Sequence, residues 1–402
     1  MTSIKEIFRI GNGPSSSHTM GPKNAAELFL ERIKGTGATS VNVTLYGSLA
    51  ATGLGHLTDQ AILSVLMSHY PTNIIWHAEI VLEHHPNGML FEALGADGKV
   101  LDSWTVYSVG GGALWWDGKQ EKEAELIYDM CHISDIKEWC YREGRTYWEY
   151  VELCEGAEIW EYLGEVWETM TQAINRGLNK EGVLPGELKV ARKAVKYFVK
   201  SDSYVGSLGS RAKIYAYALA TAEENASGGR VATAPTCGSS GVVPAVLYHV
   251  QQSRHFSRQR ILQALATAGL FANVTKKNAS LSGAEVGCQG EIGVACAMAA
   301  AAANQLFGGT LNQIEYAAEM GLEHHLGLTC DPMCGLVQIP CIERNAVAAA
   351  RAFDVNFYSM LSDGVHRISF DKVVEVMKQT GHDIPPLYRE TSEGGLAKIG
   401  KA

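Results

Sequence analysis

The pattern of hydrophobic and polar residues changes character near residue 115. Before this point, short segments alternate apolar and polar residues or are rich in Ile and Val, which is typical of β-strands. Such segments lie at 40–46, 74–82, 89–94 and 100–109, and helical patterns lie at 22–34 and 58–69. An Asp97-Gly98 turn signal separates the last two strand segments. Residues 1–115 are therefore predicted to form a small α/β sandwich.

After residue 118 the pattern becomes helical almost throughout. Helices are predicted at 120–130, 133–142, 147–152, 157–177, 187–200, 208–224, 241–252, 256–272, 290–306, 311–321 and 341–353. We therefore predict an α+β two-domain chain, in which an all-α helical domain at 116–402 follows the α/β sandwich at 1–115. The segment 113–125 is the expected linker.

Length and charge favour a globular protein of more than one domain that does not bind nucleic acid. A chain of 402 residues exceeds what one core usually serves, and its 46% hydrophobic and 19% charged residues are typical of globular proteins. The net charge of −9 and the lack of a basic run argue against a nucleic-acid partner, because phosphate contacts need clustered Lys and Arg.

The sequence offers no targeting or membrane signal. The N-terminus lacks the apolar stretch of a signal peptide. The most apolar segment, Ile292 to Leu306, is mostly alanine and is shorter than the roughly 20 residues that span a bilayer. We expect a cytoplasmic protein with no membrane partner. In that compartment, grouped cysteines more often bind metal or do chemistry than form disulfides.

Three of the nine cysteines are candidate metal ligands, and two of them, Cys288 and Cys341, lie at expected helix N-termini. Cys288 is in a glycine-rich turn before a helix, Cys341 follows Pro340 at an expected helix start, and Cys330 precedes Asp331-Pro332. Helix N-termini stabilise thiolates, the form that binds metal. The alternative is buried structural cysteine, a common state of free thiols. Spacing alone does not decide between the two.

Two polar loops in the first domain are candidate sites. The run Ser15-Ser16-Ser17-His18-Thr19, bracketed by Gly-Pro pairs, has more polar groups than a helix cap needs, so we expect it to bind a carboxylate or an amine. Glycines surround His56, a candidate acid or base. A lone histidine is more often structural.

Two glycine-rich segments leave their roles open. The turn 233–241, which contains Thr236, precedes a helix and would either bind an anion or connect two helices tightly. The strand end Gly110-Gly111-Gly112 would either cradle a phosphate or let two domains approach closely.

These residues together resemble the iron–sulfur-dependent L-serine dehydratases, or L-serine ammonia-lyases, in a single-chain form with the β-type domain before the α-type domain. The resemblance runs from about residue 5 to 355. Its strings are 13–19 (GPSSSHT), the Gly55-His56 turn, the Ser-x-Gly-Gly-Gly strand end, 179–186 (NKEGVLPG), 280–289 (SLSGAEVGCQ), 326–332 (LGLTCDP) and 340–346 (PCIERNA).

The resemblance implies a [4Fe-4S] cluster held by Cys288, Cys330 and Cys341, with the fourth iron open to substrate. It implies that L-serine loses water to form pyruvate and ammonia, and that the chain is a homodimer. The residues assigned to acid–base chemistry are His56, Ser17 and His18. The residues assigned to the substrate are Ser15, Ser16, Thr19, Thr236, Asn278, Ser280 and Ser282.

The chain departs from the family pattern in three respects. Its N-terminal domain is shorter, Cys237 has no counterpart role, and the C-terminal residues 397–402 contain no cysteine. Some members use a terminal cysteine to occupy the open iron at rest. We hypothesise that Cys334, four residues from Cys330, approaches the cluster instead.

Three rival interpretations follow from the same residues. A pyridoxal phosphate enzyme would need a Schiff-base lysine, and only Lys276 and Lys277 are suggestively placed. The same fold could act on L-cysteine or L-threonine. An iron–sulfur redox sensor without turnover would have no use for the polar loops.

Overall fold

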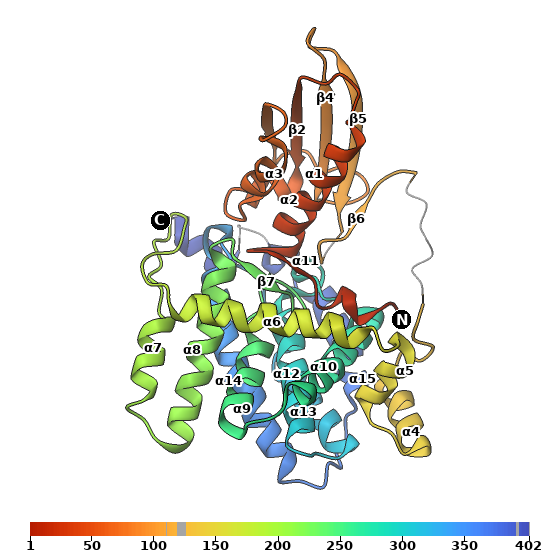
Figure 1. Cartoon of the computed structure of the whole chain (residues 1–402), viewed down its shortest axis with the longest axis vertical. Helices are drawn as coiled ribbons and strands as arrows, with labels where there is room; N and C mark the ends of the chain where they lie inside the picture. Colours follow the sequence, from red (N-terminus) through yellow and green to blue (C-terminus); the bar gives the residue numbers. More distant parts are fainter. Residues whose placement is uncertain (110, 119–125, 391–393, 402) are drawn as a thin grey trace.

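A sheet-containing unit stands on a larger helical body (Figure 1). The computed structural model describes residues 1–109, 111–118, 126–390 and 394–401. The sheet has five strands in the order β3-β2-β4-β5-β6. Their bounds are β2 (Ser40–Tyr46), β3 (Thr72–His77), β4 (Gly88–Leu94), β5 (Val100–Ser108) and β6 (Leu114–Trp115). Only the β2–β3 pair is parallel among the described strand pairs of this sheet.

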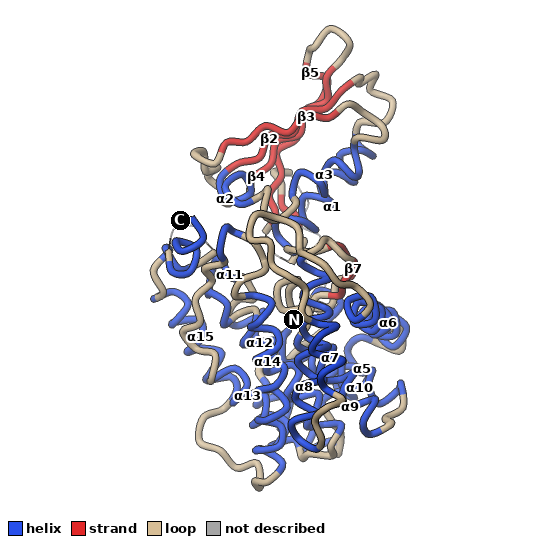
Figure 2. Tube along the Cα trace, turned by 90° about the vertical axis from the view of Figure 1, so that its left-hand side faces the viewer, coloured by secondary structure: helices blue, strands red, loops and turns tan. Residues whose placement is uncertain are grey.

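Three helices cover one face of this sheet (Figure 2). They are α1 (Gly21–Arg32), α2 (Gly47–Thr52) and α3 (Thr58–Leu66). The alternation at 40–46 is realised in β2, where Val41, Val43 and Leu45 are buried in the core between sheet and helices. The predicted α/β sandwich is confirmed, and two of its helices begin within one residue of the predicted positions.

The first residues of the chain belong to the helical body rather than to the sheet unit. Met1, Ile4 and Phe8 are buried in the large core of that body. Strand β1 (Ile10–Asn12) then pairs antiparallel with β7 (Arg230–Ala232). The chain therefore starts on the helical body and crosses to the sheet unit only at the serine-rich loop, which places that loop at the boundary between the two.

The helical body surrounds one central helix, α12. The bounds are α4 (Ile133–Glu143), α5 (Tyr147–Glu155), α6 (Ile159–Leu178), α7 (Ala194–Ser201), α8 (Gly206–Ala226), α9 (Val242–Arg254), α10 (Arg258–Asn278), α11 (Gly283–Val286), α12 (Ile292–Leu306), α13 (Leu311–Glu323), α14 (Cys341–Met360) and α15 (Phe370–Asp383). The alanines of α12 let α9, α10, α13 and α14 approach closely. At Gly321 of α13, an added Cβ would lie 3.0 Å from the Ala297 backbone.

The predicted helix at 187–200 begins only at Ala194. The backbone at 187–193 is not helical, because Ala191 forms an antiparallel β-bridge with Val183. The Lys193 N–H then donates to the buried carboxylate of Glu223 at 2.6 Å. The sequence also predicts a helix at 120–130. Residues 126–130 are not helical, so the prediction is wrong there, and residues 119–125 lie outside the described part of the chain.

The described helices differ from a membrane span in length, hydropathy or straightness. No single one of them is long and apolar enough to cross a bilayer. One pair, Gly283–Gln289 with Ile292–Leu306, meets the length and composition together but is bent by 52°.

Candidate active site

A cavity of about 300 Å³ lies where the serine-rich loop and the His56 turn meet the helical body. The predicted site residues that line it are Ser15, Ser16, Ser17, His56, Thr236, Ser280, Ser282, Cys288, Cys330 and Cys341. Residues from segments more than 300 positions apart in the sequence thus share one cavity. Of the other predicted residues, His18 lies directly behind the wall, whereas Thr19 and Asn278 have structural partners described below.

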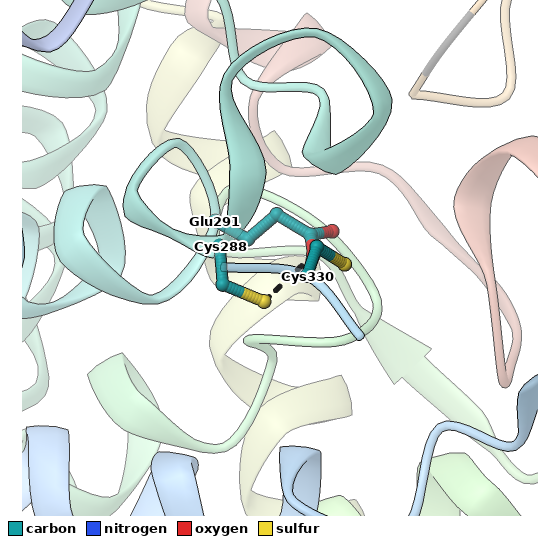
Figure 3. A group of neighbouring side chains, drawn as sticks. All are labelled: Cys288, Glu291 and Cys330. Atoms are coloured by element: carbon teal, nitrogen blue, oxygen red, sulfur yellow. Dashed lines mark hydrogen bonds between the residues drawn. The ribbon is translucent and has the colours of Figure 1, made fainter. Parts of the chain in front are cut away.

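The three predicted cysteines reach the cavity from three segments. Cys288 sits on a short 3₁₀ turn (Gly287–Gln289) between α11 and α12, and Cys341 is the first residue of α14. Cys330 lies in a loop whose backbone is bridged to Arg389. Figure 3 shows Cys288 and Cys330 next to the side chain of Glu291, and the ligand atoms of all three residues lie within 4.8 Å of one another. The Cys288 thiol donates to Glu291 Oε2 at 3.7 Å.

Burial and mutual proximity set the charge of this thiol group. The hydrogen bond with Cys288, together with burial, raises the pKa of Cys330 well above its usual value. Burial and the neighbouring Cys288 raise the pKa of Cys341 in the same way. Arg344 is hydrogen-bonded to Cys288 and also donates to Thr329 O at 2.7 Å. A bound metal centre would supply the further positive charge that thiolates require here.

The donor set fits an iron–sulfur cluster. Two buried cysteines, Cys288 and Cys330, and the partly buried Cys341 face one cavity, and thiolates are the ligands that iron–sulfur clusters prefer. Two of the thiols lie on turns that lead into helices, where N–H groups can hydrogen-bond cluster sulfur. Three protein ligands leave a fourth position for another group.

The serine-rich loop is both a helix cap and a cavity wall. Ser15 caps the turn Ser16–Met20, because its Oγ accepts from the His18 N–H at 3.1 Å. Ser16 Oγ accepts from the Cys237 N–H at 3.0 Å, which joins the loop to the helical body. Both serines also line the cavity. Capping and binding are therefore compatible for this run.

Asn225 of α8 anchors the start of the same loop. Its Nδ2 donates to the Pro14 carbonyl at 2.9 Å. A Cβ on Gly13 would lie 2.0 Å from Asn225 Oδ1 and 2.6 Å from the Asn225 carbonyl oxygen. Glycine is therefore required at residue 13 for the loop to approach α8 this closely.

His56 is held as a neutral imidazole with one nitrogen fixed. Its Nδ1 lies 3.1 Å from the Thr52 carbonyl, which only accepts, so Nδ1 carries the proton. Burial lowers the pKa of His56 to about 4. The lone pair therefore resides on Nε2, and the side chain lines the cavity. This arrangement is suited to a general base.

His18 lies against His56 with its ring centroid 4.5 Å away. Its Nδ1 is 2.9 Å from Ser17 Oγ, and its Nε2 is 3.0 Å from Ser48 Oγ. Burial and the neighbouring His56 lower the pKa of His18 well below its usual value. His18 is thus a neutral group that connects Ser17 to α2.

The remaining predicted residues divide between the cavity and its supports. Thr236 is hydrogen-bonded to the buried Glu291. Ser280 Oγ accepts from the Ser282 N–H at 3.0 Å and shapes the cavity wall. Thr19 Oγ1 donates to the His56 carbonyl at 2.7 Å. Asn278 donates to the Cys131 carbonyl at 2.7 Å, at the end of α10, and does not line this cavity among the described residues.

Four site residues were missed in the sequence. Ser48 and Thr52 lie on α2, eight and four residues before His56 respectively. This four-residue spacing, which places side chains on one face of a helix, was the signal that could have identified both residues. Glu291 lies three residues after Cys288, and Glu390 lies in a C-terminal segment without a pattern. Burial and the charge of Glu291 raise the pKa of Glu390 to about 8.

The two unassigned cysteines are not part of the cavity lining among the described residues. Cys237 is buried, and its thiol lies 3.8 Å from Met20 Sδ. Burial raises its pKa to about 12. Cys334 has a left-handed backbone with φ of 55° and lies behind Gly55, where an added Cβ would be 3.4 Å from its carbonyl.

The features behind the phosphate interpretation have other partners. Gly111 O accepts from Arg9, and Gly112 O accepts from Asn24 at 3.0 Å, so this turn joins the two parts of the chain. Gly110 lies outside the described residues. Lys276 lines the cavity and forms an ion pair with Glu6.

Two family models match this chain, and together they cover nearly all of it. Residues 48–397 match the serine dehydratase alpha chain, and residues 3–75 match the serine dehydratase beta chain. The chain therefore belongs to the serine dehydratase family, with the β-type segment first. The alpha-chain match begins at Ser48 and so includes His56, and it overlaps the beta-chain match over residues 48–75.

Curated relatives match over almost the whole length. L-serine dehydratase TdcG of Escherichia coli is 42% identical over 450 aligned positions, which cover 99% of each chain. The L-serine dehydratases of Streptomyces coelicolor and Helicobacter pylori are 40% and 38% identical, each over 98% of both chains. Because 450 positions exceed the 402 residues of this chain, that alignment contains gaps in it.

Proposed function

We propose that this protein dehydrates L-serine to pyruvate and ammonia with a [4Fe-4S] cluster bound by Cys288, Cys330 and Cys341. One observation carries the proposal: the cysteines Cys288, Cys330 and Cys341 line the same cavity as the neutral imidazole of His56. A thiol set alone would suit a redox centre, and an imidazole alone would suit many sites. Their combination suits a metal-assisted elimination, and the names of the relatives agree with serine as the substrate.

When bound, a cluster with three protein ligands supplies an open iron, a Lewis acid that stabilises the departing hydroxyl group of serine. The protein supplies the remaining functions. The hydroxyl-rich loop Ser15 to Ser17 holds the substrate carboxylate at the boundary of the sheet unit. Arg344 supports the thiolate charge of Cys288.

His56 removes the proton from Cα of the substrate through Nε2. The fixed Nδ1 proton keeps the imidazole in the tautomer that accepts there. The ring of His18 lies against that of His56 at an angle of 37° and remains neutral, so it does not repel the imidazolium that forms. Loss of the Cα proton and of hydroxide from Cβ leaves an enamine, which tautomerises to an imine and hydrolyses to pyruvate and ammonia.

Anaerobic purification tests this function directly. We expect purified protein to contain iron and acid-labile sulfide and to form pyruvate from L-serine, with both cluster and activity lost after exposure to air. The relative kcat/KM values for L-serine, L-threonine and L-cysteine then identify the preferred substrate. Protein that contains the cluster but forms no keto acid from any of the three would instead support a redox sensor.

A further inference from the structure

The segment after α15 returns to the cavity and forms part of its wall. Its backbone lies parallel to the loop that carries Cys330: the Cys330 N–H donates to Tyr388 O at 2.8 Å, and the Glu390 N–H donates to Cys330 O at 2.6 Å. Further along, the Leu396 N–H donates to the Asp331 carboxylate at 2.8 Å. These bonds fix the backbone of Glu390 against the Cys330 loop, and its side chain extends towards His18.

The side chain of Glu390 faces a part of the cavity that lacks positive charge. Its Oε1 lies 4.0 Å from Nδ1 of His18, which is a neutral imidazole in this environment. In the described part of the chain, no lysine or arginine forms an ion pair with Glu390. A buried carboxylate without a cation is unfavourable unless a ligand provides one.

We propose that Glu390 binds the α-ammonium group of the substrate and thereby selects amino acids over the corresponding hydroxy acids. The inference rests on the proposed function for the identity of the substrate. The ammonium group and the departing hydrogen are both attached to Cα, so the groups that contact them must be neighbours. Glu390 meets this condition, because it adjoins His18, whose ring is 4.5 Å from that of His56.

The other central carboxylate is less suited to this role. Glu291 is hydrogen-bonded to Thr236 and to the thiol of Cys288. It therefore belongs to the cysteine side of the cavity, whereas Glu390 lies on the histidine side. Glu291 would thus stay bound to Thr236 and Cys288, and Glu390 would be the carboxylate that contacts the ammonium group of the substrate.

The test compares a ligand that has the ammonium group with one that lacks it. In Glu390→Gln, we expect KM for L-serine to rise by about tenfold or more, because one partner of a desolvated charge pair is lost. Inhibition by 3-hydroxypropionate, which keeps the carboxylate and hydroxyl groups of serine, should be unchanged or stronger. Equal weakening of both ligands, or of neither, would overturn the proposal.

Two further variants separate binding from folding. Glu390→Asp retains the charge and should recover part of the L-serine affinity, while iron content stays that of the wild type. Glu138→Gln makes the same chemical change at an exposed carboxylate of α4, away from the cavity, and should leave both KM and inhibition unchanged. A Glu390→Asp variant as impaired as Glu390→Gln for L-serine would contradict an ionic role.

Calorimetry distinguishes failure of this inference from failure of the proposed function. L-Alanine and propionate differ by the ammonium group and do not turn over by loss of water. If wild-type protein binds L-alanine more tightly than propionate and Glu390→Gln abolishes the difference, the ammonium site stands even for a chain that forms no pyruvate. If the variant retains the difference, the site is refuted even for an active dehydratase.

Discussion

The carboxylate of Asp331 accepts a hydrogen bond from the backbone N–H of Leu396 at 2.8 Å across 65 residues of sequence. Its other oxygen accepts from the Thr329 hydroxyl at 2.8 Å and lies 3.7 Å from Nη2 of Arg344. One side chain thus joins the Cys330 loop, the first turn of α14 and the C-terminal segment.

Replacing Asp331 with Ala should release the C-terminal segment from the cavity. The Leu396 N–H would lose its acceptor, and the free energy of unfolding should fall by about 1–3 kcal/mol for the loss of a buried hydrogen-bonded carboxylate. We expect faster hydrogen exchange at the Glu390 and Leu396 amides and a higher KM for L-serine. The exposed Asp363 provides the matched control, since Asp363→Ala should leave exchange at both amides unchanged.

Each of the three cavity cysteines should be needed for iron binding. Serine in place of Cys288, Cys330 or Cys341 removes a thiolate ligand, and we expect iron and sulfide content to fall severalfold in each variant. Cys296→Ala provides the control, because that thiol is buried within α12. A variant of the three that keeps full iron content would remove that cysteine from the ligand set.

Replacing His56 with Ala should lower kcat while leaving the metal centre in place. Loss of a positioned general base reduces rates by roughly 10²–10⁴-fold. Iron content and the cluster spectrum should match those of the wild type, because His56 lies on the sheet unit and not on the loops that carry the thiols. His382→Ala alters an exposed histidine and should have no effect on kcat. Wild-type kcat in His56→Ala would assign the base to another group.

The stability of the chain should depend on pH through buried histidines such as His249. His249 lies on α9 and packs against Phe353, and its burial, with the charge of Lys213, lowers its folded pKa to about 4 from 6.5. Between pH 4 and 6.5, His249 therefore binds a proton more readily in the unfolded chain than in the folded chain. The contribution of this residue to stability is complete above pH 6.5 and is lost as pH falls towards 4.

Urea unfolding at several pH values measures this contribution. Between pH 7 and 4, the free energy of unfolding should fall by about 3 kcal/mol more in the wild type than in His249→Gln, which does not titrate. Both chains share the other titrating groups, so the difference isolates His249. Parallel pH dependences in the two proteins would show that the folded pKa of His249 is not lowered.

The sequence alone determined the local structure wherever one physical pattern dominated. Strict alternation predicted β2 to the residue, because a half-buried strand must present apolar side chains to one face. The alanine-rich run predicted α12, and the strings around the cysteines distinguished three thiols from nine. Where tertiary pairs compete with propensity the prediction failed, as at 187–193, where the buried carboxylate of Glu223 binds the backbone before α7.

Only the tertiary structure decided which residues share the cavity. Glu390 carries no local signal, and it lines the cavity because the C-terminal segment lies beside His18, which Ser48 of α2 also contacts. Periodicity reports the face that one element buries but not which distant element covers it. The boundary between the sheet unit and the helical body is formed by long-range packing, and the proposed chemistry depends on groups brought together there.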